Sequence, residues 1–237
     1  MSVPRILSVL AHPDDESFLM GGTIARYARS GEAEWYLLTL TRGEASRHRR
    51  RLNLSSDEMA ARRTTELTAA AFHLGIAEVF IRSYPDGGLR DLDPRLLIHE
   101  VETLVRQLAP AVMVTFDVQG GSLHPDHIVA HHVSKHVFCE QRERLPVLRR
   151  LAFGGLPEEM VQRFPRNLAG IPSDRLHARI PVAEYREYER MAIFAHESVR
   201  PDVEEYNYEN WMLGEFEYYS FFQERPDAVL RDLLTIP

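Results

Sequence analysis

Short apolar runs alternate with longer amphipathic segments from the N-terminus to about residue 140. Four runs have the length of a buried strand, at residues 6–10, 35–40, 79–81 and 112–116. The segments between them have apolar positions at helical spacing, which is typical of helices packed against a sheet. This alternation predicts an α/β fold with a doubly wound, mostly parallel, Rossmann-like sheet and helices on both faces.

Residues at the ends of the amphipathic segments indicate where the helices begin and end. Ser55 and Glu58 have the spacing of a capping box, and Gly75 is suited to the C-terminal end of that helix. Asp93 is a suitable N-cap, because the proline that follows it is favoured in a first helical turn. We therefore expect helices at about residues 17–30, 55–74, 94–108 and 125–140.

The pattern is less regular after about residue 145. Residues 151–153 and 176–182 have the composition of strands, and residues 184–195 have the periodicity of a helix. We interpret residues 1–237 as a single domain, because this length is usual for one large domain.

Two further segments each allow two interpretations. Residues 47–51 contain four arginines and a histidine; we favour a mobile solvated loop over a basic lid for a polar or anionic substrate. Residues 203–222 are acidic and aromatic, and they fit either a wall of a pocket or an oligomer contact.

Composition and charge exclude several classes of protein. The net charge of −7 gives no overall preference for nucleic acid or an anionic membrane. No apolar run approaches the roughly 20 residues of a membrane span, and no signal peptide is recognisable, so we expect a cytoplasmic protein. Cys139 is the only cysteine, which excludes an intrachain disulfide and a thiolate metal cluster; we expect it in the core.

The first apolar run ends in a cluster of ionisable residues. His12, Asp14, Asp15 and Glu16 lie within five positions, and Pro13 ends the strand because it has no backbone N–H donor. Negative charge at the end of a buried strand is costly unless something offsets it, and a divalent cation is one candidate.

A second cluster follows the run at residues 112–116 and places His124, Asp126 and His127 within four positions. The carboxyl ends of neighbouring parallel strands open into one crevice, so we expect the two clusters to meet there. A solvated turn would explain either cluster alone, but two clusters at strand ends indicate a functional site.

The two clusters contain the groups that amide hydrolysis needs. His12, Asp15 and His127 are two imidazoles and one carboxylate, a ligand set of catalytic zinc sites. Such a metal acidifies water and polarises a carbonyl. Asp14 neighbours a ligand but should point elsewhere, so it is a candidate general base. His124 could face the oxygen that becomes negative during attack.

Other interpretations of the clusters remain open. In the hydrolase interpretation, Asp126 would orient or charge the imidazole of His124. The same ligand set suits a non-haem iron oxygenase, which would need neither Asp14 nor His124 at these positions. A non-catalytic metal-stabilised module is a third interpretation. A dinucleotide site is disfavoured, because the first strand-to-helix turn lacks Gly-x-Gly-x-x-Gly and its carboxylates would repel a pyrophosphate.

The two clusters together resemble a known family. Residues 11–16, Ala-His-Pro-Asp-Asp-Glu, and residues 124–127, His-Pro-Asp-His, are similar to the paired motifs of LmbE-like, or PIG-L-type, zinc de-N-acetylases. Residues 63–67 with 74–75, residues 84–88 and residues 120–121 resemble other motifs of this family, so the resemblance covers most of the chain.

The resemblance implies roles for individual residues. It implies zinc on His12, Asp15 and His127, with Asp14 as the base and His124 assisting the oxyanion. It also implies sugar contacts from three residues, which are Arg63, Asp86 and Glu44.

A few positions differ from the family pattern or have no assigned role. Ser122 stands where some members have a tyrosine, so a tyrosine contribution from that position is not expected. Residues 196–199 resemble a His-x-Ser-Gln element except at Val199, which suggests a role for His196. His131 lies one helical turn from His127 and is a candidate for a supporting contact.

The implied activity is that of a metal-dependent hydrolase that removes the acetyl group from an N-acetylglucosamine-type conjugate. Zinc is the expected cofactor, and iron(II) is compatible with the ligand set. The expected partner is a small amino-sugar substrate, and a homo-oligomer is compatible with the sequence. An amidase of a thiol-sugar conjugate in the same family is the alternative.

Overall fold

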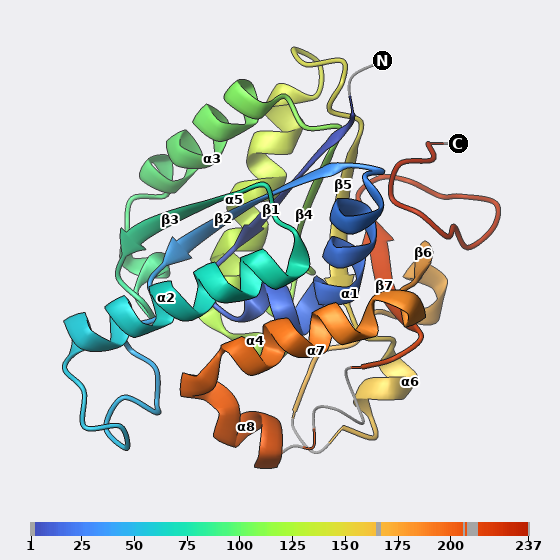
Figure 1. The fold of residues 1–237 in the computed structure, drawn as a ribbon. Helices are drawn as coiled ribbons and strands as arrows, with labels where there is room; N and C mark the ends of the chain where they lie inside the picture. Colours follow the sequence, from blue (N-terminus) through green and yellow to red (C-terminus); the bar gives the residue numbers. More distant parts are fainter. Residues whose placement is uncertain (1–2, 165–166, 206, 208–212, 237) are drawn as a thin grey trace.

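The computed structural model describes residues 3–164, 167–205, 207 and 213–236. Within these residues, seven strands form one mixed sheet in the order β3-β2-β1-β4-β5-β7-β6 (Figure 1). The strands are β1 (Arg5–Leu10), β2 (Glu34–Thr41), β3 (Glu78–Tyr84), β4 (Val112–Phe116), β5 (Arg150–Gly155), β6 (Ala178–Pro181) and β7 (Phe216–Phe221).

The order of the strands determines where a site can form. Strand β1 is parallel to β2 on one side and to β4 on the other, so the chain changes its direction of winding between β1 and β4. Strands β3 and β5 continue the parallel sheet on either side. The carboxyl ends of β1 and β4 therefore border the crevice at the topological switch point, where α/β sheets usually bind ligands.

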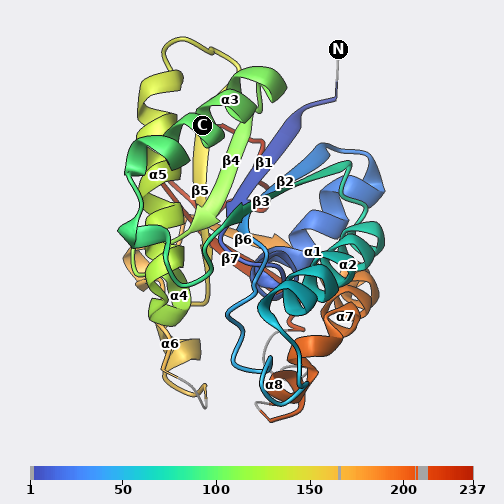
Figure 2. The ribbon, with the colours of Figure 1, turned by 90° about the vertical axis from the view of Figure 1, so that its left-hand side faces the viewer.

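Helices cover both faces of the sheet, as expected. Figure 2 shows α3 and α5 on one face and α1, α2 and α7 on the other. The longer helices are α1 (Asp15–Ser30), α2 (Ser56–Leu74), α3 (Pro94–Leu108), α5 (Pro125–Gln141) and α7 (Arg186–Ala195). The shorter ones are α4 (Gly120–Leu123), α6 (Glu158–Val161), α8 (Arg200–Glu205) and the 3-10 helices η1 (Leu89–Asp91), η2 (Ser173–Arg175), η3 (Ala183–Tyr185) and η4 (Glu197–Val199).

The predicted capping signals are confirmed. Ser55 Oγ accepts a hydrogen bond from the backbone N–H of Glu58, and the Glu58 carboxylate accepts one from the backbone N–H of Ser55. Asp93 caps α3 by accepting from the backbone N–H of Arg95 at 3.0 Å. Because these bonds satisfy N–H groups that have no partner within the helix, they fix where α2 and α3 begin.

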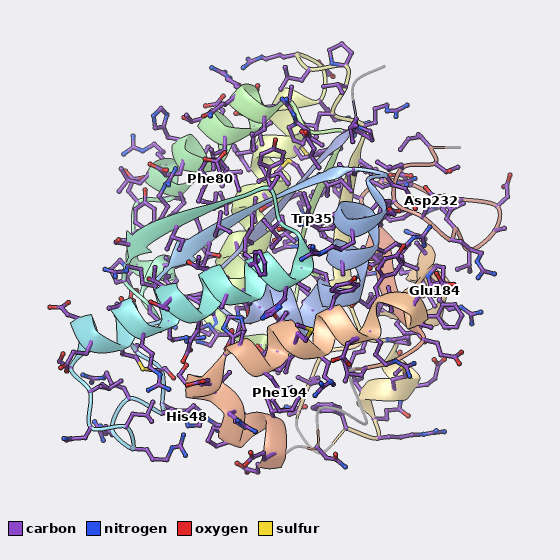
Figure 3. All side chains as sticks on the ribbon, viewed as in Figure 1. Trp35, His48, Phe80, Glu184, Phe194 and Asp232 are labelled. Carbon is purple, nitrogen blue, oxygen red and sulfur yellow. The ribbon has the colours of Figure 1, made fainter. Side chains whose placement is uncertain are left out.

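The centre of the core lies along β1, β2 and β4. All residues of β4 are buried, as are all residues of β1 after Arg5. Each apolar side chain buried there stabilises the fold by roughly 1.5–3 kcal/mol relative to exposure. Trp35 of β2, labelled in Figure 3, is fully buried, and its indole N–H has a partner because Nε1 donates to Ser8 Oγ at 3.0 Å.

The C-terminal part differs most from the sequence prediction. The strand expected at residues 176–182 is shorter, and β7, which was not predicted as a strand, lies between β5 and β6 and is antiparallel to both. Tyr219 of β7 is fully buried, so this part of the aromatic segment belongs to the core. Three other aromatic residues of the segment, Tyr206, Tyr208 and Trp211, lie outside the described residues.

The expectation for Cys139 was wrong, because its side chain is exposed. Its neighbours Val137 and Phe138 are buried, and the following helical position turns away from the sheet. In the described part of the chain, no helix is both long and apolar enough to cross a membrane.

Candidate metal centre and active site

The carboxyl ends of β1 and β4 bring the two clusters together. His12 Nδ1 lies 3.1 Å from His127 Nε2. Asp15 Oδ1 lies 3.2 Å from His127 Nε2, and Asp15 Oδ2 lies 3.5 Å from His12 Nδ1. Donor atoms bound tetrahedrally at about 2.0–2.2 Å from an ion lie roughly 3.3–3.6 Å from one another. His12, Asp15 and His127, which we call the metal triad, therefore fit one divalent cation.

Hydrogen bonds determine which ring nitrogens face the cation position. His127 Nδ1 lies 2.9 Å from the carbonyl oxygen of Gly120, so Nδ1 carries the proton and Nε2 offers its lone pair. Gly120 has φ +68°, and a Cβ there would lie only 2.8 Å from His127 Cβ. His12 Nε2 lies 3.1 Å from Asp86 Oδ1 and 3.3 Å from Asp126 Oδ2, which leaves Nδ1 for the cation. Such carboxylate–histidine pairs orient metal ligands.

The charges around the triad favour a cation. Burial alone would lower the pKa of His12, but hydrogen bonds to Asp126, Asp15 and Asp86 outweigh burial and raise it well above its usual value. Burial would raise the pKa of Asp15, but His127 and His12 hold it well below its usual value. Ionised carboxylates thus surround the two imidazoles, and the donor set suits zinc or iron(II).

His124 lies beside the triad. With His12 and His127 it forms a second group of three donor nitrogens, all within 4.8 Å of one another, that could hold a metal ion. Its Nδ1 accepts the backbone N–H of Asp126 at 3.2 Å, so the proton of the neutral ring is on Nε2. Burial, together with His12 and His127, lowers the pKa of His124. The ring is therefore a neutral Nε2–H donor at neutral pH.

The Asp126 carboxylate is not where the sequence interpretation expected it. We expected it to orient or charge His124, but Oδ2 contacts His12 and accepts the backbone N–H of Gly87 at 2.7 Å. Oδ1 accepts the backbone N–H of Leu89 at 3.1 Å. The loop after β3 holds this carboxylate, so Asp126 supports a triad member.

Asp14 occupies a strained turn directly before α1. Its φ is +102°, a value that non-glycine residues rarely adopt. Its Oδ2 lies 2.7 Å from Arg63 Nη2. Burial raises the pKa of Asp14 to about 6, with Arg63 opposing and Asp15 adding to that rise. Asp14 is therefore mostly ionised at neutral pH, close to the triad but paired with a different residue.

A buried network of side chains supports this turn. The backbone N–H of Asp14 donates to Glu16 Oε2 at 3.0 Å. Glu16 Oε1 lies 2.7 Å from His196 Nε2 and accepts from Ser17 Oγ at 2.6 Å. Both Glu16 and His196 are fully buried. His196 therefore holds the carboxylate of Glu16, and this carboxylate in turn holds the backbone N–H of Asp14. This is the role that the structure gives to His196.

Arg63 lines the cavity above the triad and also contacts three other residues of the protein. Its guanidinium donates to the carbonyl oxygens of Pro13 and Gly43 in addition to pairing with Asp14. Gly43 has φ +68°, and a side chain there would collide with this guanidinium. The sugar contact of Arg63 stays a prediction, while its contact with Asp14 is present in the structure.

Asp86 and Glu44 belong to one loop contact. Asp86 lines the cavity, and its Oδ2 accepts the backbone N–H of Ala45 at 2.8 Å. Glu44 Oε1 accepts the backbone N–H of Asp86 at 2.9 Å. Glu44 is not one of the described residues that line the cavity. Sugar contacts from both residues remain predictions, but Glu44 is placed to position Asp86.

A cavity of about 540 Å³ opens over the triad, which is in the usual size range of small-molecule sites. Arg47 and His48 (His48 is labelled in Figure 3) line it and contact Asp202 of α8, with His48 Nε2 2.9 Å from Asp202 Oδ1. The interpretation of residues 47–51 as a solvated loop is therefore wrong for His48, which is buried. Arg47, Arg50 and Arg51 are exposed, and Arg47 also pairs with Asp202.

His131 and Ser122 contact the surroundings of His127. His131 Nδ1 lies 2.9 Å from the carbonyl oxygen of Phe116, whose ring stacks on His127 with centroids 4.0 Å apart. Ser122 Oγ lies 3.3 Å from His127 Nδ1. The supporting contact expected of His131 is thus made through Phe116.

Comparison with known proteins identifies the family. Residues 7–138 match the model of the PIG-L family, described as GlcNAc-PI de-N-acetylase. The chain belongs to this family. It is 32% identical to the 1D-myo-inositol 2-acetamido-2-deoxy-α-D-glucopyranoside deacetylase of Thermobifida fusca, over 83% of each chain. For three further relatives with the same name, the match covers 43%, 57% and 53% of their length.

Solved structures share the fold of this PIG-L chain. A triple mutant of a deacetylase from the teicoplanin biosynthetic pathway superposes with a TM-score of 0.72 and 20% identity, covering 94% of this chain and all of the other. The 4-carboxy-2-hydroxymuconate hydratase GalB of Pseudomonas putida superposes with a TM-score of 0.69 and 15% identity, covering 96% and 99%. Because a hydratase shares the fold, the reaction has to be argued from the site.

Sequence reasoning missed two contributions to the site of this PIG-L chain. It gave Glu16 no role, although an acidic residue directly after two carboxylates in a buried turn signals the need for a partner. It also missed Asp202, whose contacts with Arg47 and His48 come from a helix more than 150 positions away in the chain.

Proposed function

We propose that this chain is a zinc-dependent hydrolase that removes the acetyl group from an N-acetylglucosamine-type amino-sugar conjugate. One observation carries the proposal. The facing nitrogens of His12 and His127 lie 3.1 Å apart, and each lies within 3.5 Å of a carboxylate oxygen of Asp15. The ionised carboxylate of Asp14, the residue next to this ligand, is held separately by Arg63. Family membership and the names of the deacetylase relatives support the same reaction.

In this proposal His12, Asp15 and His127 hold the metal, which acidifies water and polarises the amide carbonyl when bound. Asp14 accepts a proton from the attacking water, because a carboxyl with a pKa of about 6 is mostly ionised at neutral pH and still basic enough to accept it. The ion pair with Arg63 keeps the Asp14 carboxylate off the metal triad.

His124 and Asp126 have separate roles in this proposal. His124 donates its Nε2–H as a hydrogen bond to the oxygen that becomes negative. The proton that Asp14 takes from the attacking water is available for the departing amine. Asp126 acts with Asp86 on His12 Nε2, so both carboxylates position a metal ligand.

The substrate is a small molecule in this proposal. Asp86, Arg63 and the loop held by Glu44 would contact sugar hydroxyls, as the family resemblance implies. The Thermobifida fusca relative, which is named for an inositol conjugate of N-acetylglucosamine, supports this substrate class. A cytoplasmic location, a single domain and a homo-oligomeric state stay predictions.

Metal removal and reconstitution test the proposal. Protein stripped with a chelator should release no acetate from N-acetylglucosaminyl-inositol, and one equivalent of zinc should restore release. Iron(II), added without oxygen, tests the alternative metal. If the iron(II)-loaded protein consumed oxygen but released no acetate, it would be an oxygenase instead. Raised thermal stability with zinc, but no turnover on acetamido sugars or thiol-sugar amides, would indicate a non-catalytic metal-binding module.

A further inference from the structure

The cavity above the metal triad is lined by two chemically different groups of residues. One group is polar or charged and includes Arg47, His48 and Asp86. Apolar side chains from two segments, α1 and the chain after β5, also line the cavity, and we call these residues the apolar wall: Phe18, Leu19, Leu156, Val161 and Leu168. All five are partly exposed. Phe18 and Leu168 also pack against a small buried cluster and Leu19 against the main core, so only part of each of these three side chains faces the cavity.

Backbone hydrogen bonds join the apolar wall to α4, which directly precedes His124. Ala169 N–H donates to the carbonyl oxygen of Gly121 at 2.7 Å, next to the glycine whose carbonyl oxygen contacts His127. Ile171 N–H donates to the carbonyl oxygen of Leu156 at 2.8 Å, and Glu158 N–H donates to that of Ile171 at 3.0 Å. The segment that carries Leu156, Val161 and Leu168 is therefore held directly beside a metal ligand.

Helix α1 contributes the other two residues of the apolar wall. Phe18 and Leu19 lie one helical turn after Asp14 and Asp15, and both line the cavity. The Cβ that an alanine at Gly154 would carry lies 3.2 Å from Leu19 Cγ, so the end of β5 packs closely against this part of the wall. The apolar surface thus begins beside the proposed base.

An acetyl group presents a single methyl, and a sugar or an inositol presents mainly hydroxyls. Neither would cover the exposed parts of the apolar wall, so Leu156 and Val161, which line the cavity, would still face water in the enzyme–substrate complex. We propose that the substrate carries an apolar group of several carbons next to the hydrolysed amide, and that Leu156 and Val161 contact it. This proposal rests on the proposed function and specifies its substrate class.

Two parts of an amino-sugar substrate could supply such a group. One is the aglycone at C1, and the other is an acyl chain longer than acetyl on the nitrogen at C2. Three substrates separate these sources: the methyl and butyl glycosides of N-acetylglucosamine with the same anomeric configuration, and the methyl glycoside of N-butanoylglucosamine. Carboxylate release by the zinc-loaded full chain gives kcat/KM for each.

A partly buried methylene contributes roughly a twofold gain in kcat/KM, and a fully buried one roughly fourfold. For either the butyl glycoside or the N-butanoyl substrate, we expect kcat/KM to exceed that of the methyl glycoside of N-acetylglucosamine by about tenfold. Leu156→Gln and the nearly isosteric Val161→Thr should reduce that ratio. Leu96→Gln is the matched control, because Leu96 is a 52% exposed leucine of α3, and it should leave the ratio unchanged.

Equal kcat/KM for the three substrates would overturn the inference while leaving the proposed deacetylase function intact. A preference that survives Leu156→Gln and Val161→Thr unchanged would also overturn it, because the apolar group would then bind elsewhere. No carboxylate release from any of the three by zinc-loaded protein would overturn the proposed function and this inference together.

Discussion

Arg63 and Asp14 form a largely buried ion pair, with Nη2 and Oδ2 2.7 Å apart, beside the proposed metal ligand Asp15. The Arg63 guanidinium opposes the effect of burial on the pKa of Asp14, which is about 6. This pairing makes Arg63 a residue that sets the position and the basicity of the proposed base, in addition to any contact with a sugar.

We predict that Arg63→Gln shifts the acidic limb of the kcat/KM profile to higher pH. The sign follows from the charge: without the guanidinium the ionised form of Asp14 is less stable, its pKa rises above about 6, and fewer molecules carry an ionised base at pH 7. A pH–rate profile measures the shift. Arg62→Gln is the matched control, since Arg62 is more exposed and pairs with Glu66 and Glu197. An acidic limb at the same pH in Arg63→Gln and wild type would contradict this role.

We predict that His196→Ala lowers stability and turnover but retains the metal. The substitution leaves the fully buried Glu16 without its imidazole partner, which costs roughly 3–5 kcal/mol. For a chain of this size, that corresponds to a fall in Tm of about 10 °C. Because Glu16 also holds the Asp14 backbone, kcat should fall while KM changes little.

Two comparisons separate this role from general damage. His196→Gln keeps an N–H donor and should recover part of both losses. His136→Ala removes a half-exposed histidine of α5 and should change neither Tm nor kcat. A His196→Ala protein with normal kcat at a temperature where it is folded would show that the network does not position Asp14.

We predict that Asp126→Asn weakens metal affinity by roughly 10–100-fold, the usual effect of removing a carboxylate that orients a metal-binding histidine. The reason is its contact with His12 Nε2 at 3.3 Å. Metal titration against a chromogenic chelator measures this change, and Asp117→Asn, at a residue paired with Arg175, serves as the control. Unchanged affinity with an altered pH profile would instead favour the first interpretation, in which Asp126 acts on His124.

We predict that His124→Ala binds the metal normally and loses roughly 10²–10³ in turnover, the scale of removing one oxyanion donor. The neutral ring offers an Nε2–H, so His124→Gln, which also offers an N–H, should retain part of the activity. Metal content and kcat of both variants are the measurements. If His124→Ala lost the metal, His124 would be a fourth ligand.

Much of the fold follows from signals that are local in the sequence. The apolar runs at β1 and β4, the capping box at Ser55 and the N-cap at Asp93 each depend on neighbouring residues, and the structure contains all of them. The position of the two histidine clusters could also be predicted, because parallel strands bring their carboxyl ends to one edge.

The remaining features depend on contacts between distant parts of the chain. The partners of Asp126 are backbone N–H groups of Gly87 and Leu89, in a loop almost 40 positions earlier. Glu16 and His196 are 180 positions apart. The antiparallel insertion of β7 is likewise a long-range pairing without a local signal. These contacts decide which carboxylate serves which histidine, which residue types alone do not reveal.

The metal content and acetate release of Asp14→Asn and Asp15→Asn, measured side by side, test the central claim most directly. The same change at adjacent positions should have different results: Asp15→Asn loses the metal, whereas Asp14→Asn keeps it and loses about 10²–10⁴-fold in turnover, as expected for a general base. Metal loss in Asp14→Asn, or near-normal acetate release by that variant, would contradict the assignment of Asp14 as the base beside a three-residue metal site.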